Sequence, residues 1–404
     1  MRILIVSQDW DYRFARPQQL AMIFSEQHEI TYVATAPGIR TRVHDSRRGG
    51  IPWRPPSYRP APHIKAFSAM YLRDAGTAEA LKRNHERYAA RLKALFPGAF
   101  RDIDLAVVTN PIDAELMYSL IPQAASRKPQ ARVVYDCLDR YEDFYPEGSD
   151  LRALLLEREQ ELLQRADFVF ASSRLLVEDI RGKYERRSAK CERSDFALRT
   201  SHFPEVHYLP HGVDVERFEQ GSRTIPEDMA GIQHPIVGFV GAIEAWLDLD
   251  WVAAAAKKLT EVSFVMVGDV RCDLDGLDRL PNVRFPGYRP YNVVPSYMAS
   301  YDVCIIPFRI NRLTAAVNPV KALEYLALGK PVVSSYMPEL EQYLPYVALV
   351  RSGDEFVGSI QALLAADLPG ASAERKRIAR TRSWRAIADS FLRVVEGRAA
   401  GTGF

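Results

Sequence analysis

The chain has 404 residues, 47% of them hydrophobic and 26% charged, which suits two or three globular domains with sizeable cores. A net charge of +2 does not indicate a nucleic-acid partner, and no apolar run reaches the roughly 20 residues that span a bilayer. The four cysteines are not closely spaced, which predicts neither a zinc site nor a disulfide framework and favours a reducing cytoplasm. The short apolar start, 3–6, does not resemble a signal peptide.

The first half of the chain reads as a Rossmann-like domain over residues 1–214. Apolar runs alternate with helical patterns there, which is typical of a parallel sheet with crossover helices. Strands are predicted at 2–7, 30–34, 104–110, 132–136 and 166–173, and helices at 17–26, 77–95 and 151–165. The first strand is not followed by Gly-x-Gly-x-x-Gly, so we do not expect a dinucleotide there.

Polar side chains follow several of these strands, at the edge where open α/β sheets bind ligands. These candidates are Asp9, Asp11, Arg13 and Arg16 after the first strand, Asn110 after the third, and Asp136 and Asp139 after the fourth. For the first group, a solvated loop remains the alternative.

Residues 38–65 are rich in Arg, Gly and Pro and are predicted to resist regular structure. Residues 181–199 are basic and polar and read as an exposed insertion. Residues 1–200 hold 32 Lys and Arg against 27 Asp and Glu, so this half is mildly basic. An anionic ligand, or contact of the 40–65 loop with an anionic membrane, would suit that charge, although a plain surface loop remains the alternative.

The second half predicts another Rossmann-like domain over residues 235–372, after a boundary near 215–234. Strands are expected at 235–241, 262–269, 283–288 and 301–309, with a helix at 249–258. From residue 373 to the end, the pattern is that of an amphipathic helix.

The most informative stretch is 317–333, which reads as a loop, a short helix and a buried strand. Asn318 and Pro319 are expected at the start of the helix and Gly329 just past its end. Lys321 and Glu324 are the only charged side chains between them and share one edge of the helix. The free N–H groups at the start of this helix would suit a phosphate. A core helix with an ordinary surface ion pair is the alternative.

The run 324–333, Glu-Tyr-Leu-Ala-Leu-Gly-Lys-Pro-Val-Val, resembles the donor-site motif of nucleotide-sugar glycosyltransferases with two Rossmann-like domains, the GT-B architecture. Asn-Pro-x-Lys before it, and Tyr-Asp-x-x-Asp at 135–139, are similar to a subgroup that includes teichuronic-acid-type polysaccharide transferases. The resemblance implies two α/β domains facing across a cleft. It also implies that the last helix, 373–404, packs back on the first domain.

The same resemblance assigns roles to individual residues. It implies that Glu324 holds the ribose hydroxyls of the donor and that backbone groups near Tyr288 lie along the base. Further donor contacts are expected from Gly241, Glu244, Arg309, Asn318, Pro319 and Lys321. Acceptor contacts are expected from Asp11, Arg13, Arg16 and Asn110. If a general base is needed, Asp139 is the first candidate and Asp9 the second.

Two departures from the resembled family stand out. Its retaining members pair two Glu with seven residues between them, and counting back from Glu324 the first Glu is replaced by Ala316. Asn318 or Glu244 is a candidate substitute. Relatives also carry Arg and Lys in the Gly-rich turn at 241–244, where this chain has the acidic Glu244.

The sequence therefore predicts a cytoplasmic, metal-independent glycosyltransferase. It would move a sugar from an NDP-sugar to a glycan or lipid-linked acceptor in polysaccharide or glycoconjugate biosynthesis, with retention of configuration and with contact at the inner face of the membrane. No cofactor besides the NDP-sugar co-substrate is expected. Two alternatives remain open: a GT-B nucleotide-sugar epimerase, and a non-catalytic subunit that only binds sugar nucleotides.

Overall fold

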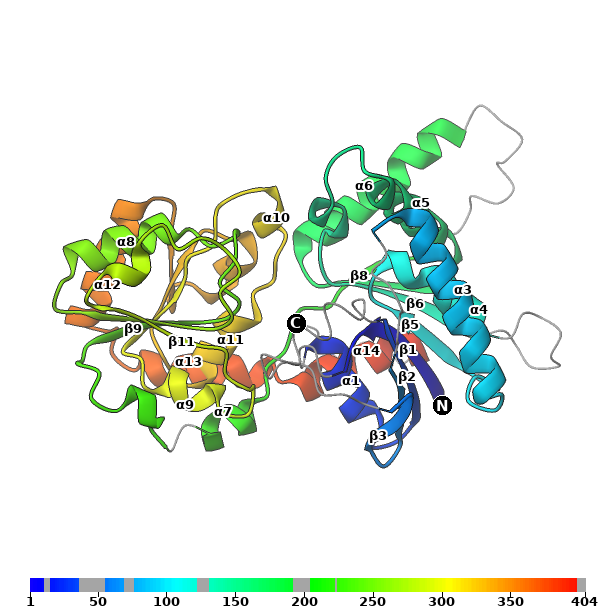
Figure 1. The fold of residues 1–404 in the computed structure, drawn as a ribbon, viewed down its shortest axis with the longest axis horizontal. Helices are drawn as coiled ribbons and strands as arrows, with labels where there is room; N and C mark the ends of the chain where they lie inside the picture. Colours follow the sequence, from blue (N-terminus) through cyan, green and yellow to red (C-terminus); the bar gives the residue numbers. More distant parts are fainter. Residues whose placement is uncertain are drawn as a thin grey trace. The chain divides into compact units, whose positions relative to one another are not determined.

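The computed structural model describes residues 1–10, 15–35, 55–68, 76–121, 131–191, 204–221 and 224–397 (Figure 1), but not the side chains of 186–191 and 221. It divides into two compact units. The first contains residues 1–210 and 388–404, and the second residues 211–387. Residues 215–234, expected at a boundary, therefore belong to the second unit, as do residues 211–214, expected in the first domain, and residues 373–387. Only the part of the last helix from residue 388 onward belongs to the first unit.

The described part of the first unit contains an eight-stranded sheet in the order β3-β4-β2-β1-β5-β6-β7-β8, parallel except for β3. Its strands are β1 (Arg2–Gln8), β2 (Glu29–Thr35), β3 (Ser57–Ala61), β4 (Ile64–Phe67), β5 (Leu105–Val108), β6 (Arg132–Cys137), β7 (Phe168–Ala171) and β8 (Val206–Tyr208). Its helices are α1 (Arg16–Phe24), α3 (Ala78–Leu95), α4 (Ala114–Leu120), α5 (Asp150–Arg165) and α6 (Arg174–Cys191), with short 3₁₀ helices η1 (Pro111–Asp113) and η2 (Tyr141–Phe144).

The prediction that residues 38–65 lack regular structure was wrong for its described end. Residues 57–61 and 64–65 belong to the antiparallel pair β3–β4, because β4 finds a parallel partner in β2. Residues 181–191, at the start of the expected exposed insertion, continue helix α6. Residues 40–54 and 192–199 lie outside the described residues, so membrane contact by the 40–65 stretch stays a prediction.

Helix α14 (Trp384–Glu396) supplies the last segment of the first unit. Phe391 stacks on Phe170 of β7, with ring centroids 4.7 Å apart, and lies 5.2 Å from the ring of Phe24 in α1. These three aromatic rings are fully or almost fully buried, so the end of the chain is part of this core.

The second unit contains a parallel sheet in the order β11-β10-β9-β12-β13-β14 among its described residues. Its strands are β9 (Ile236–Val240), β10 (Ser263–Val267), β11 (Val283–Gly287), β12 (Val303–Ile306), β13 (Val332–Ser335) and β14 (Val347–Val350). Its helices are α7 (Val215–Gly221), α8 (Leu249–Lys258), α9 (Val294–Ala299), α10 (Arg312–Ala315), α11 (Val320–Ala327), α12 (Gly353–Ala365) and α13 (Ala371–Thr381), with 3₁₀ helices η3 (Glu227–Met229), η4 (Leu277–Arg279) and η5 (Pro338–Tyr343).

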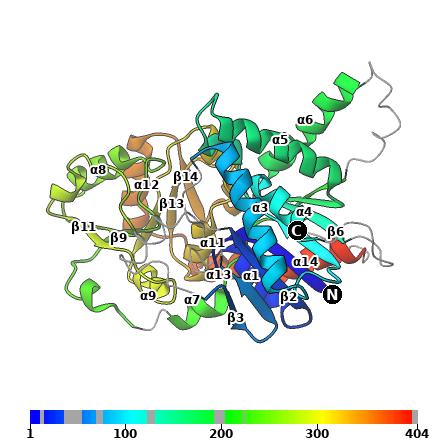
Figure 2. The same cartoon turned by 45° about the vertical axis from the view of Figure 1, so that its right-hand side comes forward.

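Apolar layers cover both faces of this second sheet. Along β10, Phe264 and Met266 face the layer that contains α8 and α12, which lie side by side (Figures 1 and 2). Val265 and Val267 face the layer that contains α9, α11 and α13. A strand buried on both faces needs apolar residues at every position, which explains the unbroken hydrophobic run of this strand.

Candidate functional site

Helix α11 begins one residue later than the sequence predicts. Val320 is its first residue, and Pro319 occupies the N-cap position with an extended backbone. Asn318 is therefore not the capping residue. It is buried, and its place before Pro319 favours an extended backbone. The first N–H groups of α11 have no partner within the helix, and the positive end of its dipole lies there.

Lys321 and Glu324 share one edge of α11, as predicted, and they form an ion pair there. Nζ of Lys321 lies 2.7 Å from Oε2 of Glu324. The Glu324 side chain is 3% exposed and that of Lys321 is 27% exposed, so the pair is open on the lysine side only. The pair is not an ordinary surface ion pair, because its carboxylate is buried. A buried carboxylate is costly unless charges or hydrogen bonds compensate it, and Lys321 supplies such a charge. A carboxylate accepts about four hydrogen bonds, so this one retains capacity for a ligand.

Helix α11 follows the point where the strand order of the sheet reverses, between β9 and β12. Open α/β sheets bind ligands beyond the carboxyl ends of their strands at such a point. The loops after these two strands are joined: Leu247 forms a β-bridge with Phe308, and the Arg309 N–H donates to the carbonyl of Trp246 at 2.8 Å. The exposed Arg309 side chain also donates from Nε to the carbonyl of Ala245 at 3.2 Å. Arg309 is thus held beside the turn that carries Glu244.

The turn after β9 lies against the loop after β10. A Cβ atom added to Gly268 would lie 1.7 Å from the carbonyl oxygen of Gly241, so this approach requires glycine. Beyond it, Arg271 lies 3.3 Å from Glu244 through Nη1 and 2.8 Å from Asp269 through Nε. The sequence analysis missed Arg271, although its place just after β10 was a signal. Arg271 puts a cation beside the turn in which Glu244 replaces the basic residues of the resembled family.

The loop after β11 carries two tyrosines with different surroundings. Tyr288, expected along a base, is 45% exposed. Tyr291 is half-buried, and its hydroxyl shares a hydrogen bond with Glu324. Sequence analysis missed Tyr291, because no local pattern connects it to a carboxylate 33 positions further along the chain.

Two candidate bases lie at the carboxyl edge of the first sheet. Asp139 is half-buried, just after β6. Asp9, the second candidate, is 2% exposed. Asn110 caps η1, since its Oδ1 accepts a hydrogen bond from the N–H of Ile112 at 3.1 Å.

Arg16, expected to contact an acceptor, lies in the interior of the first unit. Its Nε and Nη2 donate to the two carboxylate oxygens of Asp136 at 2.9 and 2.5 Å, and its Nη1 donates to the carbonyl of Leu209 at 2.5 Å. The side chains of Arg16 and Asp136 are 0% and 1% exposed. The acceptor role is therefore wrong for Arg16. Its hydrogen bonds connect α1 to β6 and to the segment that follows β8. Asp11 and Arg13 lie outside the described residues.

The acidic side chains of the described ranges do not gather into a metal site. No group of three or more His, Cys, Asp or Glu suited to a metal occurs there. Asp248 caps α8, accepting from the N–H of Trp251 at 3.3 Å, and Asp273 accepts from the N–H of Asp275 at 3.0 Å. Metal independence stays a prediction. Within the same ranges, no helix is both long and apolar enough to cross a membrane.

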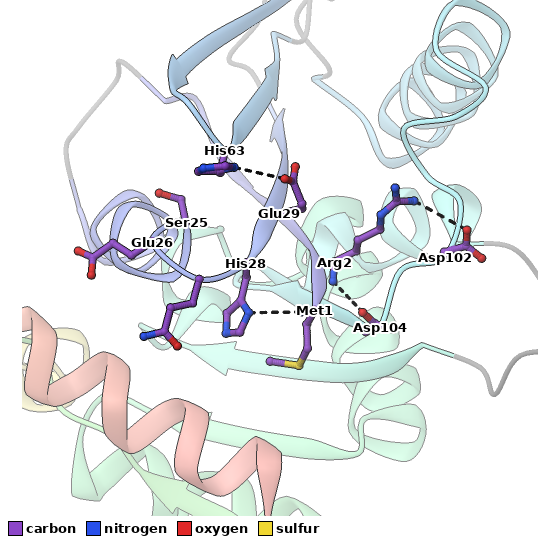
Figure 3. Close-up of a pocket in the computed structure, with 10 residues that line it drawn as sticks. Met1, Arg2, Ser25, Glu26, His28, Glu29, His63, Asp102 and Asp104 are labelled. Carbon is purple, nitrogen blue, oxygen red and sulfur yellow. Dashed lines mark hydrogen bonds and ion pairs between the residues drawn. The ribbon is translucent and has the colours of Figure 1, made fainter.

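A hollow of about 640 Å³ lies at the opposite edge of the first sheet, by the amino ends of β1 and β2 (Figure 3). Its polar groups pair with one another. His63 lies 3.3 Å from Glu29, and the backbone N–H of Arg2 donates to Asp104 at 2.7 Å. This edge is the wrong one for ligand binding in an open α/β sheet.

Residues 234–366 match the family described as Glycosyl transferases group 1. Over 274 residues the chain is 30% identical to a protein of Bacillus subtilis (strain 168) named "Putative teichuronic acid biosynthesis glycosyltransferase TuaH". That alignment covers 63% of this chain and 64% of the relative, so it spans less than two thirds of the relative's length.

Solved structures share the fold over nearly the whole chain. Sucrose-phosphate synthase from Thermosynechococcus elongatus has a TM-score of 0.68 and 16% identity, covering 98% of both chains. The α,α-trehalose 6-phosphate synthase from Burkholderia multivorans has a TM-score of 0.68 and 15% identity, covering 99% of this chain and 100% of that one. Anabaena HepE in complex with UDP and glucose has a TM-score of 0.63 and 15% identity, covering 98% and 99%. The predicted fold class, two parallel-sheet domains of GT-B type, is confirmed.

Proposed function

We propose that this chain, whose residues 234–366 form a group 1 glycosyl transferase domain, moves a sugar from a nucleoside-diphosphate sugar to a hydroxyl of a glycan or lipid-linked acceptor. The observation that carries the proposal is the half-open Lys321–Glu324 pair on the buried helix α11. The curated relative is named for teichuronic acid biosynthesis, which supports a polysaccharide precursor as the acceptor.

On the donor side, the ribose, the diphosphate and the base each have a proposed partner of suitable chemistry. The ribose offers two hydroxyl donors to the Glu324 carboxylate, and hydrogen bonds to a charged group are stronger than neutral ones. The diphosphate would be stabilised by the first N–H groups of α11, Lys321 and Arg309, with Arg271 as a further cation. The exposed ring of Tyr288 offers a surface for the base. Two structures of Anabaena HepE, which shares the fold, contain UDP, so uridine is the first base to test.

On the acceptor side, we assign Asp139 as the carboxylate that receives or orients the acceptor hydroxyl. It is more exposed than Asp9 and lies at the carboxyl edge of the first sheet. Retention of anomeric configuration remains part of the proposal, carried by the family resemblance. Ala316 is 1% exposed and cannot replace the carboxylate that family members place there. NMR of the product formed from an α-linked donor decides between retention and inversion.

Calorimetric titration of UDP, GDP and ADP into the wild type and Glu324→Gln tests the donor site. We expect Glu324→Gln to weaken nucleoside-diphosphate binding about tenfold to a hundredfold, the loss expected when hydrogen bonds to a charged acceptor become neutral ones. Glu374→Gln is the matched control, because Glu374 and Arg377 form the same i, i+3 arrangement on α13 with both side chains more exposed. Equal affinities for wild type and Glu324→Gln would remove the main support for the proposal.

Turnover then distinguishes the proposed transferase from its alternatives. Transfer requires an acceptor, whereas an epimerase converts the donor alone. A binding subunit would take up the nucleotide sugar and leave it unchanged across glycan and lipid-linked acceptors.

A further inference from the structure

We propose that Tyr291 is a positioning residue for the donor ribose, acting through the carboxylate of Glu324. This inference rests on the proposed nucleotide-sugar function and adds to it a residue from a different part of the chain. Tyr291 does not itself touch the nucleotide in this proposal. It orients the group that does.

The Glu324 carboxylate is held from two sides. Lys321 contacts Oε2 from the preceding turn of the same helix, at 2.7 Å. The Tyr291 hydroxyl shares a hydrogen bond with the carboxylate from the loop after β11. With the flexible Lys321 as its single partner, the Glu324 carboxylate could move together with the lysine side chain. A second donor on another element fixes the orientation of the carboxylate. A carboxylate with a fixed orientation can accept hydrogen bonds from the two ribose hydroxyls. Binding then does not include the entropic cost of ordering the Glu324 side chain.

Tyr291 is itself immobilised by the start of the second unit. Its ring meets Phe218 of α7 edge-on, with centroids 6.2 Å apart, and the Arg217 guanidinium lies 5.2 Å from its centroid. Asp214 fixes Arg217, accepting from Nε at 3.0 Å and from its backbone N–H at 3.1 Å. These contacts hold the ring without using the hydroxyl, so removing the oxygen alone leaves the packing intact.

The hydroxyl also keeps its proton. Burial, and then the charges of the Glu324 and Asp214 carboxylates, raise the pKa of Tyr291 well above its ordinary value. The neutral phenol can donate a hydrogen bond to the carboxylate, whereas a phenolate would repel it. Tyr291 therefore acts as a donor throughout the ordinary pH range.

The test is calorimetric titration of Tyr291→Phe with whichever of UDP, GDP and ADP the wild type binds most tightly, and with the 2′,3′-dideoxy form of that nucleotide. Tyr291→Phe should weaken binding of the ribonucleotide about three- to tenfold, the effect of one hydrogen bond. Binding of the dideoxy nucleotide should be unchanged, because it has no ribose hydroxyls that could donate hydrogen bonds to Glu324. In the Glu324→Gln background, Tyr291→Phe should add nothing. Tyr301→Phe is the control, since Tyr301 is buried in the same core and its hydroxyl has no hydrogen-bond partner among the described residues.

Each outcome decides the matter. Equal losses for the ribonucleotide and the dideoxy nucleotide would mean that Tyr291 only supports the fold, and would overturn the inference. An unchanged ribonucleotide affinity, with Glu324→Gln still weakening it, would overturn the inference and leave the proposed function standing. If the wild type binds none of the three nucleotides, both fail.

Discussion

Two buried carboxylates, one in each unit, meet a cation near the carboxyl edge of a parallel sheet, and they differ in how the cation is used. In the first unit, Arg16 and Asp136 are fully buried, and the guanidinium is shared between the carboxylate and backbone carbonyls. In the second unit, Glu324 is buried but Lys321 is partly exposed. A closed pair has its hydrogen-bonding groups used by the protein and can only stabilise the fold. In a pair that is open on one side, the exposed cation and the unused acceptor sites of the carboxylate can still bind a ligand.

The largest effect is expected from breaking the closed pair with Asp136→Asn. The variant leaves the Arg16 guanidinium buried without its counter-charge, which costs about 3–5 kcal/mol in comparable cases. Hydrogen–deuterium exchange resolved by segment should show faster exchange in β6 and α1. Glu79→Gln, which removes an exposed i, i+4 partner of Arg83, should change stability by less than about 1 kcal/mol. A small effect of Asp136→Asn would mean that the closed pair contributes no more than a surface one.

Asp139→Asn tests whether the carboxylate of Asp139, three residues after Asp136, takes part in the reaction or only stabilises the fold. We expect turnover to fall about a hundredfold or more, as when a general base is lost. Affinity for the nucleoside diphosphate should stay within about twofold, because Asp139 belongs to the other unit. Steady-state kinetics and calorimetry on the same preparation measure both. A large loss of nucleotide affinity would contradict the assignment of Asp139 to the acceptor.

Lys321→Ala tests the open side of the second pair. Its binding of the nucleoside diphosphate should weaken about tenfold, while binding of the bare nucleoside should change little, since the proposed partner of Lys321 is the diphosphate. Arg377→Ala on α13 is the matched control, and its affinities should equal those of the wild type. If Lys321→Ala weakens nucleoside and nucleoside diphosphate equally, the lysine serves Glu324 alone.

The smallest effect is expected from metal removal. If helix N–H groups and side-chain cations stabilise the diphosphate, sugar transfer in excess EDTA should keep most of its rate. Loss of activity with EDTA, restored by magnesium or manganese, would show that these protein cations are insufficient. It would also reopen the question of a metal ligand among the residues beyond those described.

Much of the fold could be predicted because local periodicity reports burial directly. The run 262–269 predicted a strand, and β10 forms there with side chains that alternate between the two apolar layers. Residues 249–258 were predicted as a helix and form α8 with the same bounds. Gly329, placed just past the central helix, has a φ of 72°, which glycine adopts without strain. In each case the deciding interactions lie within a few residues along the chain.

The candidate site depended on contacts that no local pattern contains. Arg16 and Lys321 looked alike in the sequence, as basic residues near predicted ligand-binding edges. Only the tertiary structure buried the first against Asp136, 120 positions away, and left the second partly in solvent. Tyr291 reached Glu324 in the same way, because the loop after β11 and helix α11 meet only when the sheet forms. The sequence by itself determined many of the segments that fold into strands and helices and where a ligand edge lies. The packing of distant segments decided which charges on that edge remain open to a ligand, since exposure is a property of the assembled fold.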